Sequence, residues 1–150
     1  MTDESWTPFP GWQRKGAAQM GPSQPRENGR AVLIVEDEIL ISMAVQLALE
    51  ELGFSRFVVA TTETEAVDAA RAYHPGLITA DIRLHEGSGL RAVEAIWARG
   101  PVPTVFITAT ASLLPPRLRQ TPVLQKPFTL ERLQQTVRAV LALTPPAPEP

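Results

Sequence analysis

The sequence predicts an α/β fold built around a parallel sheet. Short apolar runs alternate with longer amphipathic stretches, which is the pattern of repeated strand–helix–strand units. Polar residues of a catalytic kind appear where the apolar runs stop, as with Glu36, Asp37 and Glu38 after residues 31–35. Because ligands of open α/β sheets bind just beyond the carboxyl ends of the strands, residues at these ends are expected to share one site.

The first predicted strand covers residues 31–35, and a predicted helix over residues 38–52 follows it. The helix is expected to stop at Gly53, because a glycine commonly ends a helix in the left-handed conformation. The side chains of this helix that are predicted to be buried are Leu40, Val45, Leu47, Leu49 and Leu52.

The second predicted strand is residues 57–60. Thr62 and Glu65 follow it with the spacing of a capping box, in which the two residues satisfy each other's free backbone N–H groups. They are therefore expected to open a helix. Pro75 should end that helix, because proline disfavours helical backbone at the residue before it.

The third and fourth predicted strands are residues 77–80 and 102–108. A loop through residues 87–89 leads into a helix over about residues 89–99, which lies between these strands. The apolar side chains that this helix presents are Leu90, Val93, Ile96 and Trp97.

The last predicted strand is residues 122–125, and Thr129 is a plausible cap for a final helix. One face of that helix carries Leu130, Leu133, Val137, Val140 and Leu141. The connection over residues 109–125 contains three prolines, each destabilising a helix interior by about 3 kcal/mol. A loop or one short turn is therefore expected between strands four and five.

The composition narrows the class of protein. With 150 residues, one domain is expected over residues 30–143, between a disordered leader (residues 1–29) and a proline-rich tail (residues 144–150). The net charge of -2 offers no basic excess for nucleic acid, and no apolar run approaches the roughly 18 residues that span a membrane. The lack of cysteine excludes disulfides and thiolate metal sites, so a cytoplasmic protein is predicted.

The strand ends carry the groups of a metal and phosphate site. Glu36 and Asp37 follow the first strand and Asp81 follows the third, which gives oxygen ligands suited to Mg²⁺. Thr108 closes the fourth strand and Lys126 follows the fifth, adding a hydroxyl and a positive charge. Such an array stabilises the charge of a transferring phosphoryl group, and an aspartate can be its nucleophile.

These residues resemble the receiver domains of two-component response regulators. The resemblance covers about residues 30–143 and is carried by Val35-Glu36-Asp37-Glu38, Asp81-Ile82-Arg83-Leu84, Gly87-Ser88-Gly89-Leu90, Thr108-Ala109 and Lys126-Pro127-Phe128. It implies a CheY-like, flavodoxin-type fold, which is a doubly wound, five-stranded parallel sheet in the order 2-1-3-4-5.

The resemblance also implies the metal site and the partners. Asp81 would accept a phosphoryl group from a sensor histidine kinase or a histidine phosphotransfer protein. Mg²⁺ would be held by Asp81, by Asp37 directly, by Glu36 through water and by the backbone carbonyl of Arg83.

Thr108 and Lys126 would then contact the phosphoryl oxygens, and their rearrangement would carry the signal. The function implied is that of a stand-alone receiver that signals by phosphorylation-dependent binding to a downstream protein. Its only chemistry would be self-phosphotransfer and slow autodephosphorylation. Neither nucleic acid nor a membrane is expected as a partner.

The chain departs from the usual receiver pattern in three ways, one of which is the absence of the Gly-Ala element that often precedes the fifth strand. The interval between Thr108 and Lys126 is a few residues shorter than is usual, which implies a reduced or irregular fourth helix. Val123 stands where many receivers carry an aromatic switch residue. Both features resemble an atypical receiver subgroup found beside alphaproteobacterial sensor kinases and in general stress signalling.

Two other functions remain open from the sequence. One is an aspartyl-phosphate phosphohydrolase, although those enzymes usually place a second acid where this chain has Arg83. The other is a receiver-like scaffold that is never phosphorylated, against which the full set of site residues argues. His74 and His85 have no partner ligand at short spacing, so neither is expected to bind metal or to act in catalysis.

Overall fold

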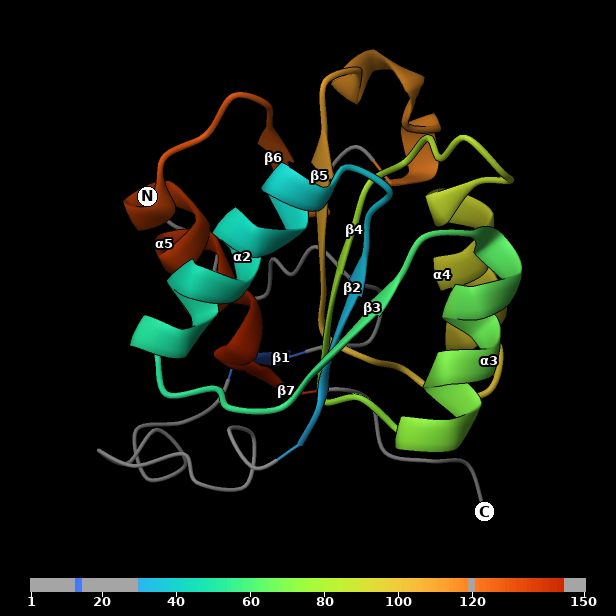
Figure 1. The fold of residues 1–150 in the computed structure, drawn as a ribbon. Helices are drawn as coiled ribbons and strands as arrows, with labels where there is room; N and C mark the ends of the chain where they lie inside the picture. The colour runs from blue at the N-terminus through green and yellow to red at the C-terminus, as the bar shows by residue number, and fades with distance from the viewer. Residues whose placement is uncertain (1–12, 15–29, 119–120, 145–150) are drawn as a thin grey trace.

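A computed structural model describes residues 13–14, 30–118 and 121–144. Its centre is a parallel sheet in the order β3-β2-β4-β5-β6, which is 2-1-3-4-5 when these strands are counted along the chain (Figure 1). The predicted fold is therefore confirmed. The strands are β2 (Val32–Val35), β3 (Phe57–Ala60), β4 (Leu77–Ala80), β5 (Thr104–Thr108) and β6 (Val123–Gln125).

Two pairs of helices cover the two faces of the sheet. α2 (Ile39–Glu51) and α5 (Leu130–Leu141) lie on one face, and α3 (Glu63–Tyr73) and α4 (Gly89–Trp97) lie on the other (Figure 1). Successive side chains of a strand point to opposite faces, so β2 contributes to both cores and all four of its residues are buried. This double burial explains why the strand is an unbroken apolar run.

The side chains that were expected to face the sheet from α4 and α5 do so. Val93 and Ile96 are buried on the sheet-facing side of α4. On α5 the buried side chains are Leu133, Val137 and Val140. At the helix ends the apolar side chains are only half-buried, but they still pack against these cores; they are Leu90, Trp97, Leu130 and Leu141.

The prediction for α2 is partly wrong. Val45 and Leu49 are buried, but Leu40 is 80% exposed and Leu47 is 52% exposed. The sheet-facing side of α2 consists of Ser42, Val45, Ala48 and Leu49. Because this helix is apolar nearly all round, its periodicity did not reveal which side would meet the sheet. The side that remains exposed carries Ile39, Leu40, Met43 and Leu47, and we call it the α2 apolar face.

The capping box before α3 forms in a shifted arrangement. The Thr62 hydroxyl accepts a hydrogen bond from the Glu65 N–H at 3.1 Å, as predicted. The Glu65 carboxylate instead accepts bonds from the N–H and the hydroxyl of Thr61, at 2.8 and 2.9 Å. These bonds favour the ionised form and lower the pKa of Glu65.

The connection between β5 and β6 is irregular, as its prolines predicted. The described residues there form two single 3₁₀ turns, Ala111–Leu113 and Pro116–Leu118. Leu114 and Leu118 are buried and pack against the core beneath α3 and α4. The segment is therefore fixed to the domain by two leucines in place of a helix.

The two ends of the described chain meet. β1 (Gln13–Arg14) pairs antiparallel with β7 (Leu143–Thr144) (Figure 1). Gln13 and Arg14 belong to the predicted leader and Thr144 to the predicted tail, so their pairing differs from the lack of regular structure expected there. The other residues of the predicted leader, 1–12 and 15–29, and the residues of the tail after Thr144 lie outside the described residues. Within the described part of the chain, the helices are too short or too polar to cross a membrane.

The contrast within α2 gives a direct stability test. Leu49→Ala should lower the free energy of unfolding by about 2–5 kcal/mol, because it leaves a cavity at a fully buried position. Leu40→Ala should change it by no more than about 0.5 kcal/mol, because that side chain is already in solvent. Urea unfolding followed by circular dichroism would measure both variants. Equal losses would show that the assigned burial of α2 is wrong.

Candidate functional site

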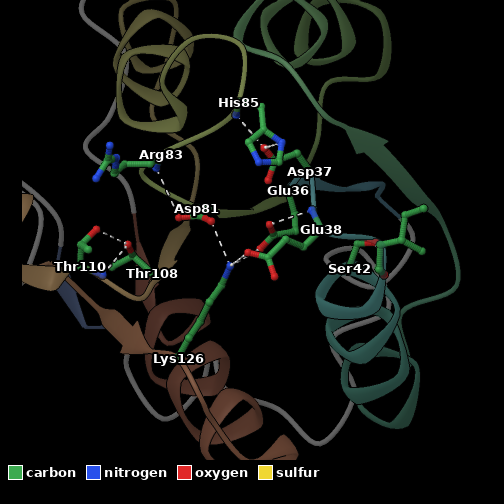
Figure 2. Close-up of polar contacts among 11 residues, drawn as sticks. Glu36, Asp37, Glu38, Ser42, Asp81, Arg83, His85, Thr108, Thr110 and Lys126 are labelled. Atoms are coloured by element: carbon green, nitrogen blue, oxygen red, sulfur yellow. Dashed lines mark hydrogen bonds and ion pairs between the residues drawn. The ribbon is translucent and has the colours of Figure 1, made fainter.

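The register of the sheet brings the predicted site residues to one edge. Val35 pairs with Ala80, and Thr108 pairs with Gln125, so the residues that follow these strands leave the sheet side by side. Figure 2 shows Glu36, Glu38 and Asp81 around the end of the Lys126 side chain, with Asp37 beside them and next to His85. The structure therefore gathers groups that are up to 90 positions apart in the chain, counting from Glu36 to Lys126.

Lys126 is the centre of the charge network. Its Nζ lies 2.9 Å from Asp81 Oδ2 and 2.9 Å from Glu36 Oε1, and 3.5 Å from Glu38 Oε1 (Figure 2). The side chains of Lys126 and Asp81 are each 10% exposed and that of Glu36 is 3% exposed. A buried charge is tolerated only when it is paired, so each of these three groups depends on the others.

The electrostatic effects of this network run in definite directions. Burial alone would lower the pKa of Lys126, but the hydrogen bonds from its ammonium to Glu36 and Asp81 outweigh burial and raise the pKa. Burial raises the pKa of Glu36, and its bond to Lys126 offsets only part of that effect. The Lys126 ammonium therefore stays charged. Ionisation of the Glu36 carboxylate is less favourable than it would be in water.

The backbone around Asp81 is packed closely. The Arg83 N–H donates to Asp81 Oδ1 at 3.3 Å, and the Gly89 N–H donates to the Ile82 carbonyl at 2.9 Å. A side chain at position 89 would collide with the carbonyl group of Asp81. Gly89 therefore lets the start of α4 lie directly against the backbone that carries Asp81.

Four carboxylates form a possible cation site. Glu36, Asp37, Glu38 and Asp81 each offer an oxygen, and these oxygens lie within 4.8 Å of one another. Hard oxygen donors at such spacing suit Mg²⁺, which usually takes one or two carboxylates together with water and phosphate oxygens. Glu38 belongs to this cluster although the sequence analysis gave it no ligand role.

His85 contacts Asp37, which the sequence did not predict. Its backbone N–H donates to Asp37 Oδ2 at 2.6 Å, and its Nδ1 lies 3.0 Å from the same oxygen. The imidazole is 87% exposed, so it covers the outer side of Asp37 (Figure 2). Because 48 positions separate the two residues, no local spacing in the sequence signals this contact. His74 lies elsewhere, at the end of α3.

Thr108 is at the predicted edge, and its hydroxyl bonds to Thr110. Its side chain is buried, and its Oγ1 accepts a bond from the Thr110 N–H at 3.1 Å and lies 3.2 Å from Thr110 Oγ1 (Figure 2). The Lys126 N–H donates to the Thr108 carbonyl at 2.9 Å, but among the described residues no hydrogen bond joins the Thr108 hydroxyl to Asp81 or to the Lys126 ammonium. The Thr108 hydroxyl is thus bonded within the loop that follows β5.

Comparisons with known proteins agree on the type of domain. The family model described as the response regulator receiver domain matches residues 32–138. The solution NMR structure of the Erythrobacter litoralis PhyR response regulator REC domain superposes with a TM-score of 0.72 at 36% identity, covering 81% of this chain and 95% of that one. Its similarity extends over nearly all of the described domain.

Two curated relatives differ in how much of their length is matched. The phyllosphere-induced regulator PhyR of Methylorubrum extorquens is 49% identical over 80 residues, which are 52% of this chain and 30% of the relative. The polar-differentiation response regulator DivK of Brucella ovis is 31% identical over 121 residues, covering 75% of this chain and 96% of the relative. The chain thus spans less than a third of PhyR and nearly all of DivK.

Removing the charge of Lys126 should destabilise the fold in a pH-dependent way. Lys126→Met leaves the buried carboxylates of Glu36 and Asp81 without their counter-charge, so a loss of about 3 kcal/mol is expected at about pH 8. The pKa of Glu36 would rise further, and the folded state would then bind more protons than the unfolded state. Stability therefore falls as pH rises, and the deficit should shrink at about pH 5.

Urea unfolding at the two pH values would measure this effect. Glu38→Gln is the matched control, because Glu38 is exposed and is the most distant of the three carboxylates from the ammonium. That variant should change stability by no more than about 0.5 kcal/mol. A Lys126→Met deficit that is the same at both pH values would contradict the charge network.

Proposed function

Because the chain belongs to the response regulator receiver domain family, we propose that Asp81 accepts a phosphoryl group from a phosphohistidine. The observation that carries the proposal is the contact of one buried ammonium, that of Lys126, with both Asp81 and Glu36 at 2.9 Å. A carboxylate oxygen of Asp81 attacks phosphorus, the P–O bond forms, and the P–N bond to the donor imidazole breaks. The bonding electrons leave with the imidazole nitrogen.

Lys126 supports this step by its charge. The transferring group spreads negative charge over its oxygens, and a fixed ammonium beside Asp81 is already in place to stabilise that charge. After transfer, the ammonium is expected to pair with a phosphoryl oxygen as well as with Glu36. The catalytic assignments are thus Asp81 as nucleophile and Lys126 as electrostatic partner, with Thr108 as a second contact to the phosphoryl group.

Mg²⁺ fits the carboxylate cluster and would be held by Asp37 and Asp81, by Glu36 through water, and by the Arg83 carbonyl. The ion would neutralise part of the charge of the donor phosphoryl group when it is bound. Among the described residues, the cluster of four carboxylates is paired with a single lysine ammonium, that of Lys126, which is consistent with a need for a further cation.

We infer that Thr108 reports the phosphorylated state. In the unphosphorylated protein its hydroxyl is engaged with Thr110, and no aromatic side chain stands at position 123 to move with it. On phosphorylation the hydroxyl would leave Thr110 and bond to the phosphoryl group. The loop after β5 would then shift and change the affinity for a downstream protein.

The α2 apolar face is proposed as the docking surface for the protein that delivers the phosphoryl group. Ile39 and Leu40 follow the acidic residues directly and are 74% and 80% exposed. Met43 and Leu47 continue the same side of the helix. A histidine donor must approach Asp81 across this edge of the sheet, so a partner that covers these side chains would also reach the phosphoacceptor.

Phosphorylation of Asp81 is tested with a small phosphodonor. With acetyl phosphate and Mg²⁺, the wild-type protein should gain the mass of one phosphoryl group, and Asp81→Asn should gain none. Asp68→Asn is the control, since Asp68 lies on α3, away from the site. Chelation of Mg²⁺ should abolish the gain. A wild-type protein that gains no mass would overturn the receiver function, and rapid turnover of the donor would favour a phosphohydrolase.

Docking on α2 is tested by comparing phosphorylation by a small donor, acetyl phosphate, with phosphotransfer from a protein donor. Leu40→Asp should keep labelling by acetyl phosphate, because the side chain is 80% exposed and is no part of the charge network around Lys126. It should slow phosphotransfer from the cognate histidine kinase or phosphotransfer protein by about tenfold or more, since a charge would enter an apolar interface. Tyr73→Asp, at an exposed apolar position on α3, is the control. Equal transfer rates for Leu40→Asp and wild type would refute this docking surface.

A further inference from the structure

A cavity lies at the opposite end of the sheet from Asp81. It has a volume of about 750 Å³ and is lined by residues of α3 and α4 and of the segments that follow each helix. We call it the basic pocket, because Arg30, Arg71, Arg99 and His74 line it and no carboxylate does. Pro75 lines it just before β4, whose other end leads into Asp81.

The hollow follows from small residues where the two helices end. Ala70, Ala95 and Gly100 line the pocket, so little side-chain volume fills the space between α3 and α4 at this point. A methyl group built on Gly100 would meet no atom within 4 Å. Ile96 and Val102 supply apolar wall, and both belong to or pack against the core beneath these helices.

The positive charges exceed what the helix ends require. The carboxyl ends of α3 and α4 each carry roughly half a negative charge, so together they offset about one of the three arginines. Within the described part of the chain, no carboxylate forms an ion pair with Arg30, Arg71 or Arg99. About two positive charges therefore remain uncompensated in a chain whose net charge is -2.

We propose that the basic pocket binds a nucleotide with at least two negative charges, of the nucleoside diphosphate class. Guanidinium groups match phosphate oxygens in pairs of hydrogen bonds, and the three arginines come from three separate segments around one space. The apolar wall would receive the base or the ribose. The volume lies within the range of roughly 300–1,000 Å³ that is typical of small-ligand pockets.

This site does not depend on phosphorylation of Asp81. The two sites lie at opposite ends of β4, and none of the residues that line the pocket belongs to the carboxylate cluster. A nucleotide bound there would contact α3, α4 and the segment before β5. It would give the domain a second input beside the phosphoryl group.

The test is isothermal titration calorimetry of the full chain with ADP, GDP, pyrophosphate and adenosine. The buffer contains EDTA, so that no Mg²⁺ draws phosphate to the acidic site. One of the two nucleotides is expected to saturate a single site. Pyrophosphate should bind about tenfold more weakly because it leaves the apolar wall empty, and adenosine should not bind because it leaves the arginines unpaired.

Variants locate the site. Arg71→Ala and Arg99→Ala should each weaken nucleotide binding by about tenfold or more. Arg132→Ala, an exposed arginine on α5, and Asp81→Asn should bind as the wild type does. Arg30 is left unchanged because its side chain packs over Gly76. Amide resonances of Gly100 and Val102 should shift on binding in two-dimensional NMR spectra.

Three results would overturn the proposal. They are the lack of saturation by either nucleotide at millimolar concentration, nucleotide binding that survives both Arg71→Ala and Arg99→Ala, and pyrophosphate binding as tight as that of the nucleotides. The last result would show a simple anion site without a place for the nucleoside. Circular dichroism of the two variants would verify that they remain folded, as expected for exposed side chains.

Discussion

The balance between one buried ammonium and the carboxylates around it is the constraint on which the rest of the site depends. Lys126 is within 2.9 Å of Asp81 and of Glu36, and its own side chain is almost fully covered. Since none of these charges has free access to water, the three strands that carry them must keep their register for the charges to remain paired. The position of β6 therefore matters for both stability and the site, because a shift of this strand would leave Glu36 and Asp81 buried without a counter-charge.

Around this network the molecule combines a packed interior with a partly apolar exterior. β2 is buried on both faces, and the helix pairs close the two cores. The α2 apolar face is left open beside the acidic residues, while the link from β5 to β6 is reduced to two short turns held by Leu114 and Leu118. The surface proposed for a phosphodonor and the segment proposed to report phosphorylation therefore belong to different elements at the same edge of the sheet.

The two ends of β4 have opposite electrostatic character. Carboxylates gather at its carboxyl end around Asp81, and arginines gather at its amino end around the basic pocket. All four residues of β4 are buried, and this strand connects the segment that lines the basic pocket to Asp81. The proposed nucleotide site and the proposed phosphorylation site would thus lie at the two ends of the same strand of the sheet.

The sequence by itself determined the strands, the order of the elements and the identity of the residues at the strand ends, because apolar periodicity and prolines are local signals. It also indicated the irregular connection between β5 and β6, since a proline disfavours the helix in which it lies. Only the tertiary structure decided which side of α2 is buried, because an almost wholly apolar helix has no periodic contrast to read. Packing likewise brought His85 to Asp37 and Glu38 to Lys126, turned Thr108 toward Thr110 and assembled the basic pocket. These contacts join residues whose proximity depends on strand register and helix ends, which no local pattern encodes.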